Sequence, residues 1–124
     1  MAASFNDSTA IFLQIARKIE DDIVEQRLNE GDQVPSTNQF ASFYQINPAT
    51  AAKGINLLVD EGILFKKRGI GMFVAEGART ALMNKRKMSF YDDYVIPLIK
   101  ESEKIGISIT ELIQMIDQGR EGEE

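Results

Sequence analysis

The sequence contains no cysteine and no histidine. Without cysteine the chain forms no disulfide and no thiolate metal site, and without histidine it lacks imidazole ligands and the usual general base near neutral pH. Hydrophobic runs are also short, far below the roughly 20 residues that a membrane-spanning helix needs. These absences argue against an enzyme and predict no catalytic residue, no metal site and no cofactor. They also predict a cytoplasmic protein with no membrane partner.

The composition is that of a folded protein of about one domain. The 124 residues are 44% hydrophobic and 27% charged, and the net charge is −5. A negative total argues against a protein that coats nucleic acid nonspecifically. Within residues 35–75, however, four basic residues outnumber two acidic ones, whereas the rest of the chain has ten basic and seventeen acidic residues. Positive charge is therefore concentrated in one segment.

The first helix is predicted over about residues 10–28. Its apolar residues recur at a four-residue step, which is typical of a helix with one buried face: Ile11, Ile15, Ile19 and Ile23. Asp21 and Asp22 could suggest a catalytic carboxylate pair. Because neighbours on a helix point about 100° apart, they do not converge on one substrate, and a solvated face is the better interpretation.

Two short helices with strong start signals follow. Ser36 and Gln39 have the spacing of a capping box, so a helix should begin at Ser36. Asn47 is a good N-cap and Pro48 suits the first helical position, which predicts a third helix over 48–61. Its inward stripe is expected to be Ala51, Ile55 and Leu58.

A basic hairpin is predicted next. Gly62 ends the third helix, and two β-prone runs, 63–65 and 72–74, are separated by the segment 66–71, which holds three basic residues and two glycines. Three helices followed by a two-stranded hairpin is the order of a winged helix-turn-helix, in which one helix enters the major groove of DNA and the hairpin, the wing, touches the flanking duplex.

The remaining residues are predicted to form a helical segment. A helix over about 78–104 should break or kink at Pro97 into two pieces. Ser108 and Glu111 form a second capping box before a last helix over about 109–118. The residues from Gly119 onward are expected to fray.

This order of elements predicts which residues meet DNA. The groove-facing candidates at the starts of the second and third helices are Ser36, Thr37, Asn38, Asn47, Ala49, Thr50 and Lys53, and the wing candidates are Lys67, Arg68, Gly69 and Gly71. Each feature has a structural alternative. Ser36 and Asn47 also serve as helix caps, and the basic run from Lys66 to Arg68 would suit a solvated hairpin edge.

The segment from Pro35 to Val74 resembles the DNA-binding domain of the GntR family of bacterial transcription regulators. The matching residues are Pro35-Ser36, Phe40-Ala41, Asn47-Pro48 with Thr50, Glu61-Gly62-Ile63, and Arg68-Gly69 with Gly71-Met72-Phe73-Val74. With the first helix included, the resemblance covers about residues 9–76. It implies a DNA-binding domain over 1–76. Residues 77–124 are too few for a large effector domain and resemble the short YtrA-like branch, whose two-helix C-terminal segment makes the dimer.

Four positions depart from the family pattern. Asn38 stands where the family usually has a DNA-contacting arginine, and Gln45 stands where glycine is common. Ile70 occupies a wing position that is often basic, and Gly54 replaces a usual alanine. The number of charged DNA contacts should therefore be small.

The predicted fold is mainly α with a small β-hairpin: a winged helix-turn-helix followed by a two-helix C-terminal dimerisation segment. The candidate subunit contacts are Tyr91, Val95, Leu98, Ile105, Leu112 and Ile116, unless these residues form a seam within one chain. The predicted function is that of a homodimeric repressor on a pseudo-palindromic double-stranded DNA operator, with a small-molecule effector of unknown identity or none. The alternative is a winged-helix module that binds another protein and not DNA.

Overall fold

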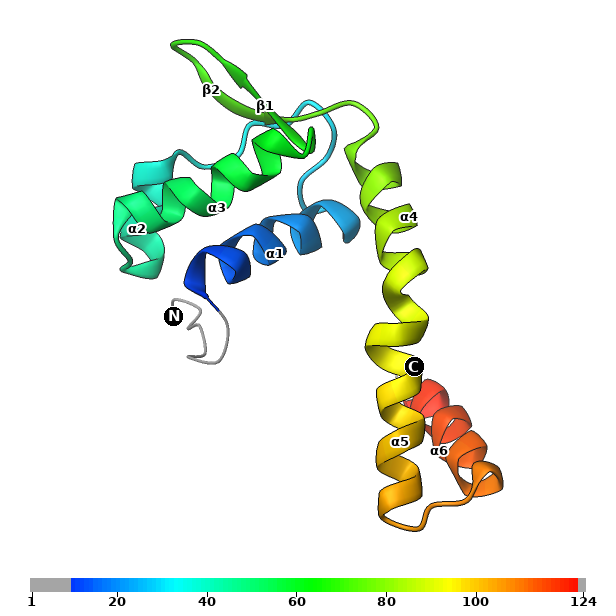
Figure 1. Cartoon of the computed structure of the whole chain (residues 1–124). Helices are drawn as coiled ribbons and strands as arrows, with labels where there is room; N and C mark the ends of the chain where they lie inside the picture. Colours follow the sequence, from blue (N-terminus) through cyan, green and yellow to red (C-terminus); the bar gives the residue numbers. More distant parts are fainter. Residues whose placement is uncertain (1–9, 123–124) are drawn as a thin grey trace. The chain divides into compact units, whose positions relative to one another are not determined.

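The structure, a computed structural model, describes residues 10–122 and divides the chain into two compact units, one up to Asn84 and one from Lys85 onward. The first unit contains α1 (Ile11–Val24), α2 (Thr37–Tyr44), α3 (Pro48–Asp60), β1 (Leu64–Lys67), β2 (Gly71–Val74) and the start of α4 (Ala78–Phe90) (Figure 1). The second contains the end of α4, the π-helical segment η1 (Tyr91–Val95), α5 (Ile96–Lys104) and α6 (Ile109–Gly122). The predicted order of helices and hairpin is confirmed.

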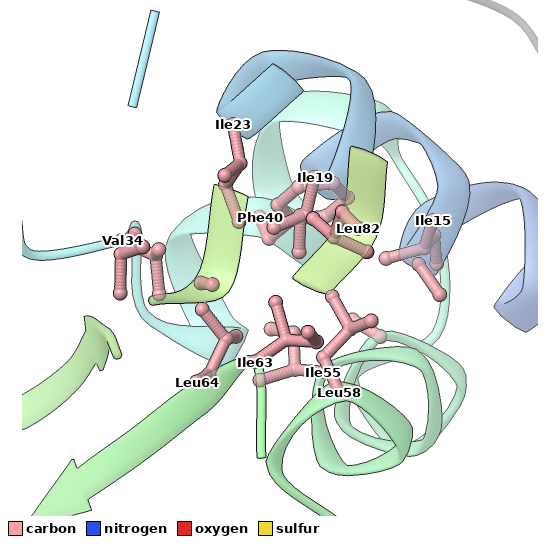
Figure 2. Packing of buried hydrophobic residues seen from close by; sticks show 14 of the residues in the cluster. Ile15, Ile19, Ile23, Val34, Phe40, Ile55, Leu58, Ile63, Leu64 and Leu82 are labelled. Carbon is pink, nitrogen blue, oxygen red and sulfur yellow. The ribbon is translucent and has the colours of Figure 1, made fainter. Parts of the chain in front are cut away.

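One apolar core holds the first unit together. Figure 2 shows side chains from α1, α2, α3, β1 and α4 converging on it. The largest fully buried members are Ile15, Ile19, Ile23, Ile55, Leu58, Leu64, Val74 and Leu82. All three residues of the stripe predicted for α3, namely Ala51, Ile55 and Leu58, are completely buried. The first turns of α4 belong to this core through Ala78 and Leu82. The division into a DNA-binding domain over 1–76 and a dimerisation segment over 77–124 stays a prediction.

Gly54 allows α1 and α3 to pack closely. A Cβ atom at this position would lie 2.6 Å from the carbonyl oxygen of Phe12 and 3.0 Å from Cβ of Ile15. No methyl group fits at the first distance. The glycine that lowers helix propensity in α3 is therefore the residue that lets the backbones approach.

The first helix is shorter than predicted and ends at Val24, not near Leu28. Gln26 has a φ of +64°, which takes the chain out of the helix. The N–H groups of Arg27 and Leu28 then donate to the carbonyl of Asp22, at 2.8 and 3.0 Å. The chain thus turns back over the last turn of α1, and the apolar Leu28 packs beside the core from the loop.

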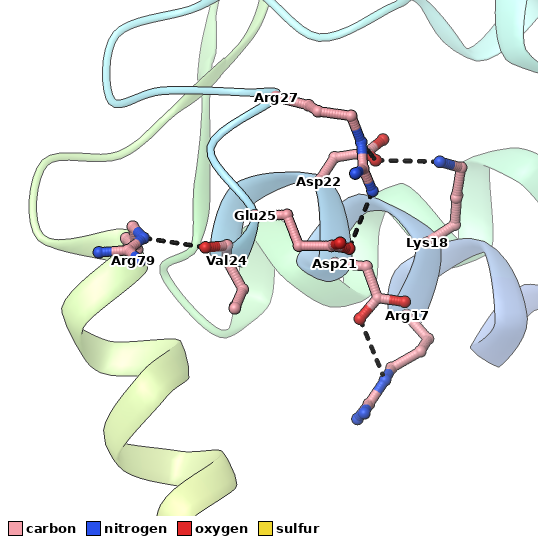
Figure 3. A network of polar contacts seen from close by, with 8 residues as sticks. All are labelled: Arg17, Lys18, Asp21, Asp22, Val24, Glu25, Arg27 and Arg79. Atoms are coloured by element: carbon pink, nitrogen blue, oxygen red, sulfur yellow. Dashed lines mark hydrogen bonds and ion pairs between the residues drawn. The ribbon is translucent and has the colours of Figure 1, made fainter. Parts of the chain in front are cut away.

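The acidic residues of α1 form ion pairs, as the solvated-face interpretation implies. Asp21 lies 3.5 Å from Nε of Arg17, and Asp22 lies 2.9 Å from Nζ of Lys18 and 2.8 Å from Nε of Arg27 (Figure 3). Hydrogen bonds to Glu25 and Asp22 raise the pKa of Arg27 above its usual value.

The start of α4 is tied to the end of α1. Nε of Arg79 donates to the carbonyl oxygen of Val24 at 3.0 Å (Figure 3). Carbonyl groups in the last turn of a helix have no hydrogen-bond partner within the helix, and the Arg79 guanidinium supplies one for Val24. Its positive charge also interacts favourably with the negative end of the α1 dipole.

The helix of the second unit is interrupted earlier than predicted. The break is the π-helical segment at Tyr91–Val95, before Pro97 and not at it. The N–H of Ile96 donates to the carbonyl of Tyr91, five residues back. Because Pro97 has no N–H and its ring would crowd the carbonyl four residues earlier, the preceding turn widens and α5 begins with Pro97 in its first turn.

The last helix begins as predicted and extends further. The Ser108–Glu111 capping box forms with both hydrogen bonds at 3.2 Å. The helix continues to Gly122, so the prediction that the chain frays from Gly119 onward is wrong for residues 119–122, because Arg120 and Glu121 are good helix formers. The predicted tail beyond Gly122 lies outside the described residues. Among the helices that the structure describes, none has the length and apolar character needed to cross a bilayer.

Candidate nucleic-acid interface

The start of α2 is a fully formed capping box. The backbone N–H of Gln39 donates to Oγ of Ser36 at 3.1 Å, and the N–H of Ser36 donates to Oε1 of Gln39 at 2.9 Å. Thr37 is half-buried, while Ser36 and Asn38 are exposed. The cap predicted for Ser36 is confirmed, and the exposed positive end of the α2 dipole is suited to a phosphate.

The start of α3 presents small and polar groups to solvent. Oδ1 of Asn47 accepts a hydrogen bond from the N–H of Ala49 at 2.7 Å, and Pro48 occupies the first helical turn as predicted. Asn47, Ala49 and Lys53 are exposed and Thr50 is half-buried. The Asn47 carboxamide uses its oxygen in the cap, and its nitrogen takes no part in that bond. The first two turns of α3 are therefore accessible from solvent along this side.

Lys53 has a partner that the sequence did not indicate. Its Nζ lies 4.1 Å from the centre of the Phe12 ring on α1. A cation at this distance over an aromatic face is attracted by the ring quadrupole. The ring therefore restricts where the Lys53 ammonium is placed at the exposed surface.

The wing is a short antiparallel hairpin with a tight tip. Its strands pair Leu64 with Val74, Phe65 with Phe73, Lys66 with Met72 and Lys67 with Gly71. The strand β1 begins at Leu64, one residue later than the predicted run 63–65, and extends to Lys67, while β2 begins one residue earlier than predicted, at Gly71. The turn therefore shrinks to Arg68, Gly69 and Ile70. Gly69 has a φ of +78°, which favours glycine. All three basic side chains of the wing are exposed.

One face of the wing combines two aromatic rings with a lysine. The rings of Phe65 and Phe73 stack with centroids 5.8 Å apart, and Nζ of Lys67 lies 4.6 Å from the Phe73 centroid and 5.8 Å from that of Phe65. Side chains at alternate positions of a strand share a face, so the register of the hairpin produces this cluster. Lys67 is therefore held over the rings, whereas Lys66 pairs with Met72.

The structure also adds residues that the sequence analysis missed. The Phe12 ring lies beside Lys53, and the Phe65–Phe73 pair lies beside Lys67. Gln33 contacts the wing tip through a hydrogen bond from its Nε2 to the carbonyl of Ile70 at 3.1 Å. The two phenylalanines of the wing could have been paired from an assumed hairpin register. Phe12 and Gln33 carried no local signal.

The interface candidates lie on one unit. Figure 1 shows α2 beside α3 and the hairpin extending from the end of α3. The starts of α2 and α3 and the tip of the wing together offer capped helix ends, exposed amides and three exposed basic groups at Lys53, Lys67 and Arg68. Within residues 10–122 no group of three metal-binding side chains gathers.

The second unit exposes a large apolar surface. Of the predicted subunit contacts, Tyr91, Leu98, Ile105 and Ile116 are exposed, Val95 is half-buried, and Leu112 is only 7% exposed. Further exposed apolar side chains are Met88, Phe90, Tyr94, Ile109, Ile113 and Met115. A soluble protein seldom leaves so many large apolar groups together in water unless they meet a partner.

Known proteins with similar sequences and structures are regulators. Residues 12–74 match the family model described as bacterial regulatory proteins, gntR family. The HTH-type transcriptional repressor YtrA of Bacillus subtilis is 29% identical over 90% of this chain and 85% of its own length. The regulator YhcF of the same organism is 29% identical over 98% and 99%.

A solved structure agrees with these sequence relatives. The crystal structure of a transcriptional regulator of the GntR family from Bacteroides thetaiotaomicron has a TM-score of 0.71 and 32% identity, over 93% of this chain and 100% of that one. The family match covers the three helices and the wing, where the exposed helix ends and basic hairpin lie. The chain therefore belongs to the GntR family of bacterial transcription regulators, with a winged-helix DNA-binding fold.

Proposed function

We propose that this chain is a homodimeric, sequence-specific repressor that binds a pseudo-palindromic DNA operator. The observation that carries the proposal is the open start of α3, with Asn47, Ala49 and Lys53 exposed on the same unit as a basic wing. A helix whose first turns are small and polar can enter the major groove, where amide and ammonium groups donate to base edges and a methyl group meets thymine.

The remaining candidates take supporting roles at the DNA backbone. Ser36, Thr37 and Asn38 at the start of α2 face a phosphate with hydroxyl, amide and backbone donors. The resemblance to the family implies an arginine at the position of Asn38, so the contact there is uncharged in this chain. On the wing, Lys67 and Arg68 supply charge, and Gly69 and Gly71 let the turn come close to the duplex.

The apolar surface of the second unit supports the homodimer. The helix α6 exposes Ile109, Ile113 and Ile116 on one side. A second copy covers such a face with the same residues, because a two-fold interface is self-complementary. Two copies would present two winged-helix units to two half-sites, which is why a pseudo-palindromic operator follows from the dimer.

Repression is proposed from the relative YtrA, which is named a transcriptional repressor. No cofactor enters this activity.

Selection of bound fragments from a random duplex library tests the proposal directly. We expect an inverted repeat whose half-sites lie about 34 Å apart, one helical turn of DNA. A variant with Asn47, Thr50 and Lys53 all changed to alanine should no longer prefer the selected sequence, although its wing residues are unchanged. Recovery of no enriched sequence would favour the alternative of a protein-binding module, and recovery of single, unpaired half-sites would contradict the dimer.

A further inference from the structure

We propose that Gln33 is a positioning residue of the wing, which fixes the wing tip and, through Phe73, the place of the Lys67 ammonium at DNA. The inference rests on the proposed function, since it concerns how the wing meets the duplex. Gln33 lies in the linker between α1 and α2, outside the predicted helices and hairpin.

The linker pairs with β2 through an isolated antiparallel bridge between Gln33 and Phe73. The N–H of Gly31 donates to the carbonyl of Val74, and the N–H of Val74 donates to the carbonyl of Asp32, both at 2.9 Å. The N–H of Val34 donates to the carbonyl of Met72, also at 2.9 Å. Gln33 sits between these bonds and bridges to Phe73. The backbone of β2 is therefore held from both sides near its base, by β1 and by the linker.

The side chain of Gln33 carries this support to the tip of the wing. Its Nε2 donates to the carbonyl of Ile70 at 3.1 Å. The position of the amide depends on the glycine beside it, because a Cβ at Gly71 would lie 2.5 Å from Nε2. Gly71 also has a φ of +146°, a backbone conformation in which a residue with a side chain would be strained. Gly71 thus leaves room for the Gln33 carboxamide beside the turn.

This support of β2 also helps to place the ammonium group of Lys67. Its ammonium lies over the Phe73 ring at 4.6 Å, and Phe73 is the residue with which Gln33 pairs. Lys67 itself pairs with Gly71 across the hairpin. A cation that is already placed loses less conformational freedom when it binds a phosphate. Gln33 therefore contributes to DNA affinity, although its side chain is neutral and contacts the wing instead of the DNA.

The variant Gln33→Met tests this role, because methionine keeps the length of the side chain and removes the amide donor. A hydrogen bond contributes on the order of 1 kcal/mol, which limits the loss of operator affinity to about fivefold, and we expect a fall of about two- to fivefold. The matched control is Gln118→Met, which makes the same exchange at an exposed position on α6 and should leave affinity unchanged.

A double-mutant cycle separates positioning from a general structural effect. If Gln33 acts through Lys67, Lys67→Ala should weaken binding less in the Gln33→Met background than in the natural chain. The salt slope of Gln33→Met should also move toward that of Lys67→Ala. Independent effects of the two substitutions, or an unchanged affinity of Gln33→Met, would overturn the inference while leaving the proposed function intact.

A measurement without DNA completes the test. Backbone order parameters of residues 68–71 should fall in Gln33→Met and remain unchanged in Gln118→Met. Unaltered order parameters in both variants would overturn the positioning role of Gln33 even if no duplex were selected. A failure to select any duplex with the natural chain would instead count against the proposed function.

Discussion

The ammonium of Lys53 on α3 lies 4.1 Å from the centre of the Phe12 ring on α1. This contact joins the proposed groove-reading helix to the helix behind it. It also gives a lysine assigned to DNA contact a second, structural role.

Lys53→Ala should weaken operator binding far more than it destabilises the fold. An exposed cation–π contact contributes about 0.5–1 kcal/mol, so the loss in free energy of unfolding should not exceed this range. Fluorescence anisotropy with the operator and urea denaturation measure the two quantities. Phe12→Leu is the companion variant, which removes the ring and keeps the lysine. A stability loss in Lys53→Ala as large as its loss in binding energy would make the lysine structural.

Gly54→Ala should destabilise the first unit, although alanine is normally the better helix former. The added Cβ would meet the carbonyl oxygen of Phe12 at 2.6 Å, and such overpacking typically costs about 1–3 kcal/mol. Gly119→Ala on α6 is the matched control. Nothing lies within 4 Å of its Cβ position, so it should stabilise α6 by up to about 1 kcal/mol. Thermal unfolding followed by circular dichroism compares the two, and a more stable Gly54→Ala protein would contradict the close packing.

Ser36 can be tested separately as a cap and as a DNA contact. Ser36→Ala should lower the free energy of unfolding by about 1 kcal/mol, because the N–H of Gln39 loses its acceptor. Ser36→Asp keeps a good cap but adds a negative charge, so it should preserve stability and weaken operator binding. Ser42→Ala, at an exposed position of α2, controls for the loss of a hydroxyl. Tight operator binding by Ser36→Asp would remove Ser36 from the interface.

Operator binding should depend only moderately on salt. Lys67 and Arg68 meeting one phosphate each in two subunits give a slope of log K against log salt of about −4. Arg68→Ala should reduce the slope by about 2, because one contact is lost in each subunit. Titration from low to high potassium chloride measures both values. A slope near −10 would reveal phosphate contacts outside these residues.

Ile113→Glu should convert the proposed dimer to a monomer. Ile113 is 55% exposed in the single chain, so a glutamate there spares the fold of one chain but places a charge in an apolar interface. Gln118→Glu, on the other side of α6, is the control. Sedimentation equilibrium gives the mass and anisotropy gives the accompanying loss of operator affinity. A dimeric Ile113→Glu protein would place the interface elsewhere.

Local features of the sequence predicted local structure well. The caps at Ser36, Asn47 and Ser108 form because the interacting groups lie within three residues of each other, so no knowledge of the fold is needed. The buried stripe of α3 followed from helical periodicity for the same reason. These signals were enough to order the helices and the hairpin, and hence to indicate the winged-helix fold.

Contacts between distant segments could not be predicted in this way. Lys53 meets Phe12, and Gln33 meets Ile70, only after α1, α3 and the wing have packed. Pro97 signalled a break in the helix but not its place, since the turn before a proline can relax over several residues. The roles of the candidate DNA contacts depend on a molecule outside the chain, so neither local sequence patterns nor packing within the chain determines them.

The wide turn at Tyr91–Val95 has a consequence for the helix that follows it. A five-residue hydrogen-bonded loop holds one residue more than an α-helical turn, so it rotates all later side chains by about 100° around the axis. Deleting one residue here would restore a continuous α-helix and keep α5 in its present alignment with Lys85–Phe90. If the turn instead closed to α-helical geometry with no residue removed, a different set of α5 side chains would come into line with Lys85–Phe90. The wide turn thus determines which groups the second unit displays together.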